Sequence, residues 1–386
     1  MKKVMYLSGV FPNPLIKSKI NENDILINTA NRLKSEVFCV FTLPYSNFFI
    51  SKFSSKYFEY YIAAKTGSFC VQGFNIITFP ILNPPVKVFF KKVFFMASLF
   101  FNSVNIKRVI TEKSIDIVHA QSVVVDCFIS RRLFEKCGVP YVVTIRGMPD
   151  FYSKLVYDNL ASAQVVIALS TITQEKVKRL YNIDSVVIPH GVDDIFFQPQ
   201  KKKEKNNENV IKLVTVCRLL ALKNIDKVIY AIAKSKKEIY FDIYGDGDEL
   251  PKLKALVAGL KLELFINFKG RVDNGELPKL LNEYDCFVMP SFPESLGRVY
   301  FEAMAVGLPV VGVRGTGVDG AITDGREGFL LDSATADELE VRFDHVDFCR
   351  TKLASMGNNA KALAEDYRWE NIIQKLEDVY NQACKK

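Results

Sequence analysis

Two glutamates in the last third of the chain, Glu294 and Glu302, are separated by seven residues. Glu294 stands in a loop that contains two prolines, and Glu302 lies in a stretch that the pattern predicts to be a helix ending at Gly307. The start of such a helix stabilises an anion through unpaired backbone N–H groups and the helix dipole. A carboxylate repels a phosphate group, because both are negatively charged, but it accepts hydrogen bonds from the hydroxyl groups of sugars. We therefore expect one glutamate to hold a ribose and the other a second sugar.

The other residues that could bind a metal or move a proton are scattered. The chain has three histidines, of which His119 ends a predicted strand and is interpreted as a structural residue or, alternatively, a base. The triplet Asp246-Gly247-Asp248 matches a loose metal-binding pattern that chance alone produces in a chain of this length. We interpret it as a turn, and no built-in metal site is expected.

Short apolar runs alternate with helical patterns, which is typical of doubly wound α/β domains. In the first half the predicted strands are Val4–Leu7, Val37–Phe41, Ile115–His119, Tyr141–Thr144, Val165–Ala168 and Val186–Ile188. In the second half they are Lys212–Val216, Phe241–Tyr244, Phe265–Lys269, Cys286–Met289 and Pro309–Val313. Two such sets predict two Rossmann-like sheets.

A chain of 386 residues is long enough for two domains. Residues 198–209 are polar and rich in lysine and asparagine, which is typical of a flexible connector. We place a first domain at 1–197, a connector at 198–209, a second domain at 210–366 and a C-terminal helix at 367–386.

The excess of positive over negative charge lies in the first half of the chain. Residues 1–196 contain 23 Lys+Arg and 14 Asp+Glu, a net charge of +9, whereas the remainder is near neutral. The basic residues do not form a recognisable nucleic-acid-binding motif, so nucleic acid is not expected as a partner. An anionic membrane surface is the alternative partner.

The segment 87–105 has two interpretations. Its lysines Lys87 and Lys91 fall on one narrow stripe of a helical wheel, and most of the remaining circumference is apolar and rich in phenylalanine. It is either a helix buried against the sheet or an interfacial helix that inserts aromatic side chains into a membrane.

Several features predict a cytoplasmic protein. The longest uncharged apolar run, Val93 to Ile106, is too short to span a bilayer as a helix. The N-terminal residues lack the cleavage site of a signal peptide, and the eight cysteines contain no CxxC pair.

The sequence around the two glutamates resembles glycosyltransferase family 4. The resemblance is carried by Pro290-Ser291, by Glu294 and Glu302 in an E-x7-E arrangement, and by Glu302-Ala303-Met304-Ala305 followed by Gly307 and Pro309. Further segments similar to the family are Val187-Ile188-Pro189-His190-Gly191-Val192-Asp193, Val216-Cys217-Arg218-Leu219 with Lys223, Tyr244-Gly245-Asp246-Gly247, Phe268-Lys269-Gly270-Arg271-Val272 and Trp369-Glu370. Together they extend through nearly the whole chain.

The resemblance implies the GT-B fold, in which two Rossmann-like domains face a central cleft and a C-terminal helix crosses back onto the N-terminal domain. It implies that the domain at 1–197 binds the acceptor and that the domain at 210–366 binds a nucleotide sugar. It also implies that Glu294, Arg218 and Lys223 are the catalytic residues. The implied donor-binding residues are Gly270, Arg271, Val272, Ser295, Leu296, Gly297, Arg298 and Glu302. On the acceptor or cleft side it points to Gly9, His119 and Arg146.

This sequence departs from the family pattern at several of these positions. Cys217 and Asn224 replace usual glycines, Gly9 stands where a Gly-Gly pair is common, and Asp319 lies near the usual place of a glutamate. Arg146 replaces the histidine of a T-x-H-G segment, so any role of that histidine is lost.

The resemblance implies a retaining, metal-independent hexosyltransferase with no cofactor. Its donor would be a nucleotide-diphosphate sugar, a UDP-sugar or alternatively a GDP-sugar. The acceptor would be a glycan or lipid-linked glycan of bacterial cell-surface polysaccharide, lipopolysaccharide or lipid-linked oligosaccharide synthesis, at or near the cytoplasmic membrane. The alternatives are a GT-B sugar-nucleotide epimerase and a non-catalytic, membrane-associated protein that binds nucleotide sugars.

Overall fold

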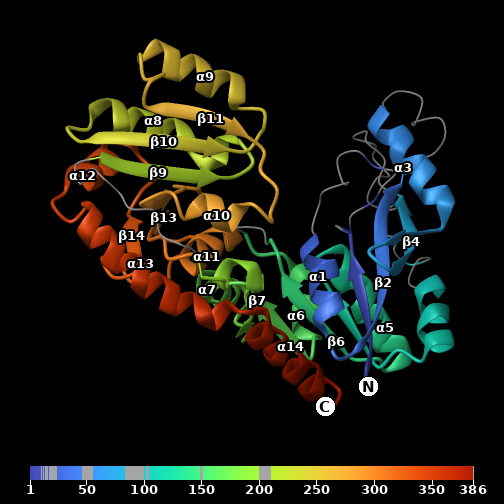
Figure 1. Ribbon diagram of the computed structural model, residues 1–386. Helices are drawn as coiled ribbons and strands as arrows, with labels where there is room; N and C mark the ends of the chain where they lie inside the picture. The colour runs from blue at the N-terminus through green and yellow to red at the C-terminus, as the bar shows by residue number, and fades with distance from the viewer. Residues whose placement is uncertain are drawn as a thin grey trace. The chain divides into compact units, whose positions relative to one another are not determined.

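The chain folds into two compact units, each built around its own sheet (Figure 1). The computed structural model describes residues 1–9, 11, 13, 16, 24–45, 55–82, 100, 104–147, 151–199 and 210–385. The first unit comprises Met1–Leu169, Gln174–Ile188 and Ile373–Lys386, and the second comprises Ser170–Thr173 and Pro189–Ile372. The second unit thus begins ahead of the predicted connector, most of which falls outside the described residues.

The first unit contains an eight-stranded sheet in the order β3-β4-β2-β1-β5-β6-β7-β8. Its strands are β1 Lys3–Ser8, β2 Glu36–Tyr45, β3 Ser68–Val71, β4 Phe74–Leu82, β5 Ile117–Ala120, β6 Tyr141–Ile145, β7 Val165–Ala168 and β8 Val186–Val187. All neighbouring pairs are parallel except β3 with β4. The order reverses between β1 and β5, which is where doubly wound sheets bind ligands at their carboxyl edge.

Helices connect the parallel strands of this first sheet. They are α1 Asp24–Arg32, α3 Ser55–Thr66, a helix over 104–113, α5 Val125–Cys137, α6 Lys154–Ala161 and α7 Thr171–Tyr181. The six strands predicted for this half are all present. The β3–β4 hairpin was not predicted; it turns at Gln72 and Gly73, which both have positive φ, and a glutamine is a weak signal for such a turn.

The second unit contains a six-stranded parallel sheet in the order β11-β10-β9-β12-β13-β14. Its strands are β9 Val210–Val216, β10 Glu238–Tyr244, β11 Ile266–Gly270, β12 Cys286–Val288, β13 Val310–Val313 and β14 Gly328–Leu331. In sequence order this is 3-2-1-4-5-6, the arrangement of dinucleotide-binding domains. The predicted Rossmann-like sheets are therefore confirmed, with β14 as an additional short edge strand.

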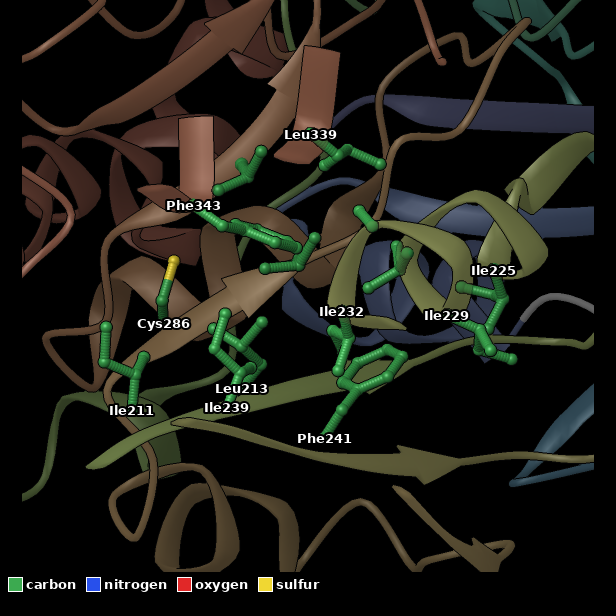
Figure 2. Packing of buried hydrophobic residues seen from close by; sticks show 14 of the residues in the cluster. Ile211, Leu213, Ile225, Ile229, Ile232, Ile239, Phe241, Cys286, Leu339 and Phe343 are labelled. Carbon is green, nitrogen blue, oxygen red and sulfur yellow. The ribbon is translucent and has the colours of Figure 1, made fainter. Parts of the chain in front are cut away.

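The helical elements of the second unit are α8 Ile225–Lys234, α9 Leu250–Gly259, α10 Leu277–Leu281, α11 Arg298–Ala305, α12 Ala336–Asp344, α13 Arg350–Ala364 and the 3-10 helices Asp194–Phe197, Ala221–Lys223 and Glu365–Tyr367. Figure 2 shows how two of them cover the sheet. Ile225, Ile229 and Ile232 of α8 lie over the apolar side chains of β9 and β10, and Leu339 and Phe343 of α12 join the same cluster. This core holds β9 in place, and the loop that follows β9 contains Arg218 and Lys223.

The last helix, α14 Trp369–Ala383, begins in the second unit and continues in the first. Within the second unit its Trp369 indole N–H donates to the Asp193 carboxylate at 2.8 Å. Within the first unit, the Ser35 backbone N–H and hydroxyl donate to the Glu377 carboxylate at 3.0 and 2.9 Å. The predicted return of the C-terminal helix to the first unit is confirmed.

The candidate membrane helix at 87–105 lies almost entirely outside the described residues, and so do Lys87, Lys91 and Lys92. Within the described part of the chain, every helix is too short or too polar to cross a bilayer.

Candidate functional site

The loops that follow β9 and β12 meet at the point where the order of the second sheet reverses. Two hydrogen bonds tie these loops together. The Phe292 N–H donates to the Leu222 carbonyl at 2.9 Å, and the Asn224 side-chain amide donates to the Pro290 carbonyl at 2.8 Å. Parallel sheets bind ligands at this position, so the two loops define a candidate site.

Lys223 and Glu294 form an ion pair across these loops, with 2.6 Å between Lys223 Nζ and Glu294 Oε2. Each side chain is 16% exposed. The Ser291 hydroxyl donates to the same carboxylate oxygen at 3.2 Å. The fold thus brings together two residues that the sequence assigned to catalysis, and it adds Ser291, which the sequence placed in the motif without a role.

Arg218 lies at the start of the same loop and is exposed. It makes no ion pair with any residue that the structure describes. Its guanidinium is therefore a second cation at the carboxyl edge of the sheet, beside the Lys223–Glu294 pair rather than within it.

Asn224 and Cys217 stand in this loop at two positions where the family pattern usually has glycine. Asn224 has φ 53° and ψ 34°, the left-handed conformation that asparagine tolerates better than most residues. Its side chain also holds Pro290, a bond that glycine would not supply. The backbone at Cys217 does not adopt the positive φ that would favour glycine. Burial raises the pKa of the Cys217 thiol to about 11, so the thiol is a poor nucleophile at neutral pH.

The glycines of Tyr244-Gly245-Asp246-Gly247 allow the β10 loop to pack against the β9 loop. Gly245 has φ +131°, and a Cβ there would lie 1.8 Å from the Cys217 carbonyl oxygen. A Cβ on Gly247 would lie 2.3 Å from the Leu219 carbonyl oxygen. The interpretation of Asp246-Gly247-Asp248 as a turn agrees with this packing. Within the described residues there is no group of three or more potential metal ligands.

The predicted donor-binding residues Ser295, Leu296 and Gly297 precede α11, whose N-cap is Gly297 with φ +70°. No side chain caps this helix, which leaves its first N–H groups for another acceptor. The preceding loop is held by the Gly317 N–H, which donates to the Glu294 carbonyl at 2.9 Å. A Cβ on Gly317 would lie 2.2 Å from Leu296 Cα, so the close approach of these two loops requires glycine.

Glu302 lies on α11 one turn after Arg298, and Arg298 Nε is 2.7 Å from Glu302 Oε1. The Glu302 side chain is only 6% exposed. Burial raises the pKa of Glu302; Arg298 opposes this rise and the nearby Asp193 carboxylate adds to it. Asp193 also accepts the Trp369 indole N–H. In the sequence, Asp193 was named only as part of a segment similar to the family. Its position near Glu302 was not predicted.

The other residues predicted to bind the donor lie around the end of β11. The Gly270 carbonyl accepts the Gly245 N–H at 2.7 Å. Arg271 is exposed, with its guanidinium 3.6 Å from the Asp246 carboxylate, and Val272 is half-buried. Asp319 turns inward on its own loop, where its carboxylate accepts the Gly315 N–H at 2.7 Å.

His119 is buried in the first unit, and both of its ring nitrogens are hydrogen-bonded there. Nδ1 lies 2.7 Å from the Tyr380 hydroxyl and Nε2 lies 2.7 Å from the Thr144 hydroxyl. Burial, with Arg146 as a second cause, lowers the pKa of His119 to about 3. Of its two predicted roles the geometry favours the structural one, because the neutral ring links β5 and β6 to α14.

Arg146 and Gly9 lie at the carboxyl edge of the first sheet. Arg146 Nε donates to the Gln121 side-chain oxygen at 3.0 Å, and burial lowers the pKa of Arg146 to about 10. The Gly9 backbone N–H stabilises the carboxylate of Asp126, which also accepts the Thr42 hydroxyl at 2.7 Å. Asp126 and Gln121 were not predicted as site residues, since neither belongs to a recognisable motif.

The comparisons with known proteins agree with this architecture. The family model described as "Glycosyl transferases group 1" matches residues 196–363, and the model described as "Glycosyltransferase Family 4" matches residues 68–195. The Anabaena HepE protein, solved in complex with UDP and glucose, has a similar fold with a TM-score of 0.69 at 18% identity, covering 99% of this chain and 100% of that one.

Two curated relatives are similar in sequence. One is the GtfA subunit of UDP-N-acetylglucosamine–peptide N-acetylglucosaminyltransferase from Streptococcus parasanguinis, 28% identical over 50% of this chain. The match covers only 39% of the length of that relative. The other is the putative teichuronic acid biosynthesis glycosyltransferase TuaC from Bacillus subtilis, 26% identical over 66% of this chain and 70% of the relative.

Proposed function

The chain belongs to glycosyltransferase family 4, and on that premise we propose that it is a retaining transferase that moves a hexosyl group from a nucleotide-diphosphate sugar to an acceptor hydroxyl. The observation that carries the proposal is the Lys223–Glu294 ion pair at the switch point of the second sheet, with Glu302 on the adjoining helix. The cation suits the diphosphate, and the carboxylates suit hydroxyl groups.

In this proposal the bond between the anomeric carbon and the diphosphate oxygen breaks while a bond to the acceptor oxygen forms on the same face of the sugar. The acceptor proton passes to an oxygen of the departing diphosphate. Negative charge grows on that group, where Lys223, Arg218 and the uncapped start of α11 stabilise it. Glu294 orients the transferred sugar and Glu302 binds the ribose.

We propose a UDP-sugar as the donor, with a GDP-sugar as the alternative. The support is indirect: the Anabaena protein of similar fold was solved with UDP and glucose, and the streptococcal relative is named for UDP-N-acetylglucosamine. The Bacillus subtilis relative is named for teichuronic acid biosynthesis. This supports an acceptor in bacterial cell-surface polysaccharide, lipopolysaccharide or lipid-linked oligosaccharide synthesis.

A panel of UDP- and GDP-sugars tests this function through thermal stabilisation and slow hydrolysis of the donor. We expect one nucleotide class to raise the Tm and one sugar to be hydrolysed. Conversion of the donor to an epimer without an acceptor would identify a sugar-nucleotide epimerase. Neither binding nor turnover would favour a non-catalytic protein.

Turnover is expected to survive treatment with EDTA. In this proposal Arg218 and Lys223 stabilise the charge that develops on the diphosphate, so they replace the divalent cation that can serve this purpose in other enzymes. The measurement is the initial rate before and after chelation, with magnesium added back as the control. Loss of activity on chelation and recovery with magnesium would refute the metal-independent mechanism.

We also propose that the protein associates with the inner face of the cytoplasmic membrane, because the net charge of +9 lies in residues 1–196. Each Lys or Arg near an anionic surface contributes about 1 kcal/mol, and salt screens this attraction. The protein should therefore sediment with anionic but not zwitterionic liposomes at low salt. Changing Lys87, Lys91 and Lys92 together to Glu should abolish sedimentation and leave nucleotide binding intact. Equal binding of the unchanged and triply changed proteins would exclude this segment as the anchor.

A further inference from the structure

The loop that carries Glu294 connects two elements of the second unit. It follows β12 at Met289 and ends at Gly297, the N-cap of α11. The conformation of this loop determines where the Glu294 carboxylate lies. One completely buried side chain, that of Tyr300 in the first turn of α11, contacts both ends of the loop.

The hydroxyl of Tyr300 holds the start of the loop. It donates to the backbone carbonyl of Met289, directly after β12. The same carbonyl accepts the backbone N–H of Ser291 at 2.7 Å. These two hydrogen bonds restrain the turn over residues 289–291.

The ring of Tyr300 holds the end of the loop. Gly297 has φ +70°, and a Cβ there would lie 2.5 Å from Tyr300 Cδ2. The ring therefore lies directly against the backbone of Gly297. It also meets the ring of Phe287 on β12 edge to face, with 5.6 Å between the ring centroids. Tyr300 thus connects the sheet to the N-cap of α11.

A further hydrogen bond connects the turn over residues 289–291 to the Glu294 carboxylate. The Ser291 hydroxyl donates to Glu294 Oε2 at 3.2 Å, and the same oxygen lies 2.6 Å from Lys223 Nζ. Ser291 is completely buried, so the position of its hydroxyl depends on the backbone of the turn. The orientation of Glu294 therefore depends on the residue that holds this turn.

The Tyr300 hydroxyl keeps its proton at neutral pH. Burial raises the pKa of Tyr300, the Glu294 carboxylate adds to the rise, and a hydrogen bond from the Ser291 backbone opposes it. The hydroxyl is therefore a lasting donor to the Met289 carbonyl. It is not suited to general acid or base catalysis, which requires a pKa near the working pH.

We propose that Tyr300 is a positioning residue, whose hydroxyl holds Glu294, through Met289 and Ser291, in the orientation that the transferred sugar requires. The inference rests on the proposed function, in which Glu294 orients that sugar. Because Tyr300 is completely buried, it acts through the loop and not by contact with the sugar. A displacement of about 1 Å in a catalytic site can lower a rate by about a hundredfold.

The test is Tyr300→Phe, which removes only the hydroxyl. The substrate is the nucleotide sugar that the unchanged protein hydrolyses, and we expect kcat for its hydrolysis to fall about tenfold or more. The affinity for the free nucleotide diphosphate of that donor, UDP or GDP, should be unchanged in calorimetry. This ligand has no transferred sugar, so its binding does not depend on the orientation of Glu294.

Tyr141→Phe is the matched control. Tyr141 is completely buried on β6 of the first unit, and its hydroxyl also donates to a backbone carbonyl, that of Asn159. Each change removes one buried hydrogen bond and should lower the Tm, but only Tyr300→Phe should lower kcat. Equal losses of kcat in the two variants would assign the effect to stability and overturn the proposal.

Ser291→Ala provides a second variant, because the Ser291 hydroxyl connects the turn to Glu294. It should also lower kcat. If Tyr300 acts through Ser291, the double variant should lose no more kcat than the more strongly affected single variant. Losses that multiply in the double variant would show that the two residues act independently and would overturn the proposal.

Two other results would also overturn the inference: an unchanged kcat in Tyr300→Phe, or a loss of nucleotide affinity in proportion to the loss of kcat. The same measurements separate this inference from the proposed function. If the unchanged protein neither binds a nucleotide diphosphate nor hydrolyses a nucleotide sugar, the proposed function is wrong and the inference fails with it. If the unchanged protein does both and Tyr300→Phe has no effect, only the inference is wrong.

Discussion

Lys223→Met is expected to lower kcat by about a hundredfold to a thousandfold, the usual effect of removing one charged donor from a developing anion. Lys223 Nζ lies 2.6 Å from the Glu294 carboxylate, and both side chains are largely buried. In the proposed reaction, negative charge develops on the diphosphate only as the glycosidic bond breaks. The interaction with Lys223 therefore strengthens most in the transition state, and kcat should fall more than donor affinity.

The measurement combines steady-state kinetics with calorimetric titration of the nucleotide sugar. Lys227→Met is a matched control, because Lys227 lies on the neighbouring α8 and its side chain is 40% exposed beside Asp226. Lys223→Met also leaves Glu294 without its cation, so Lys223→Met combined with Glu294→Gln separates this effect from catalysis. An unchanged kcat with weakened donor binding would show that Lys223 only binds the ground state.

The two sheets could be predicted from the sequence because their strands are short apolar runs bounded by turn residues. Glycines also helped to predict the loops of the second sheet, because close packing between neighbouring loops requires a residue without a side chain at these positions. Gly245 must have no side chain, since a Cβ there would overlap the Cys217 carbonyl oxygen. Such constraints produce short motifs that can be recognised in the sequence. Two residues of these motifs, Lys223 and Glu294, form an ion pair in the structure.

Gln121 and Asp126, at the carboxyl edge of the first sheet, could not be predicted in this way, whereas Arg146 was predicted from the family resemblance. Thr42 lies in a strand, Gln121 follows another strand and Asp126 lies in a helix, and none of the three belongs to a recognisable motif. Only the strand order β2-β1-β5-β6 brings them together. Likewise, nothing in the sequence around His119 indicates that its Nδ1 forms a hydrogen bond with the hydroxyl of Tyr380, which is far away in the sequence.

Glu302→Gln is expected to weaken donor binding by about 1 to 3 kcal/mol, or roughly tenfold to a hundredfold. The ionised carboxylate accepts stronger hydrogen bonds from ribose hydroxyls than an amide oxygen does. Arg298 keeps this carboxylate in place at 2.7 Å, and the side chain is almost completely buried. Because burial raises the pKa of Glu302, with Asp193 adding to the rise and Arg298 opposing it, protonation begins above the usual pH range of a glutamate.

Donor affinity should therefore fall as the pH is lowered from neutral, and the Glu302→Gln variant should lack this part of the pH dependence. Calorimetric titrations at several pH values measure both effects. Glu340→Gln on α12 is the control, since Glu340 is 3.8 Å from Lys234 in a different part of the second unit and should not alter donor binding. If donor affinity and its pH dependence were the same in the Glu302→Gln variant as in the unchanged protein, Glu302 would be a structural partner of Arg298 and not a ligand of the ribose.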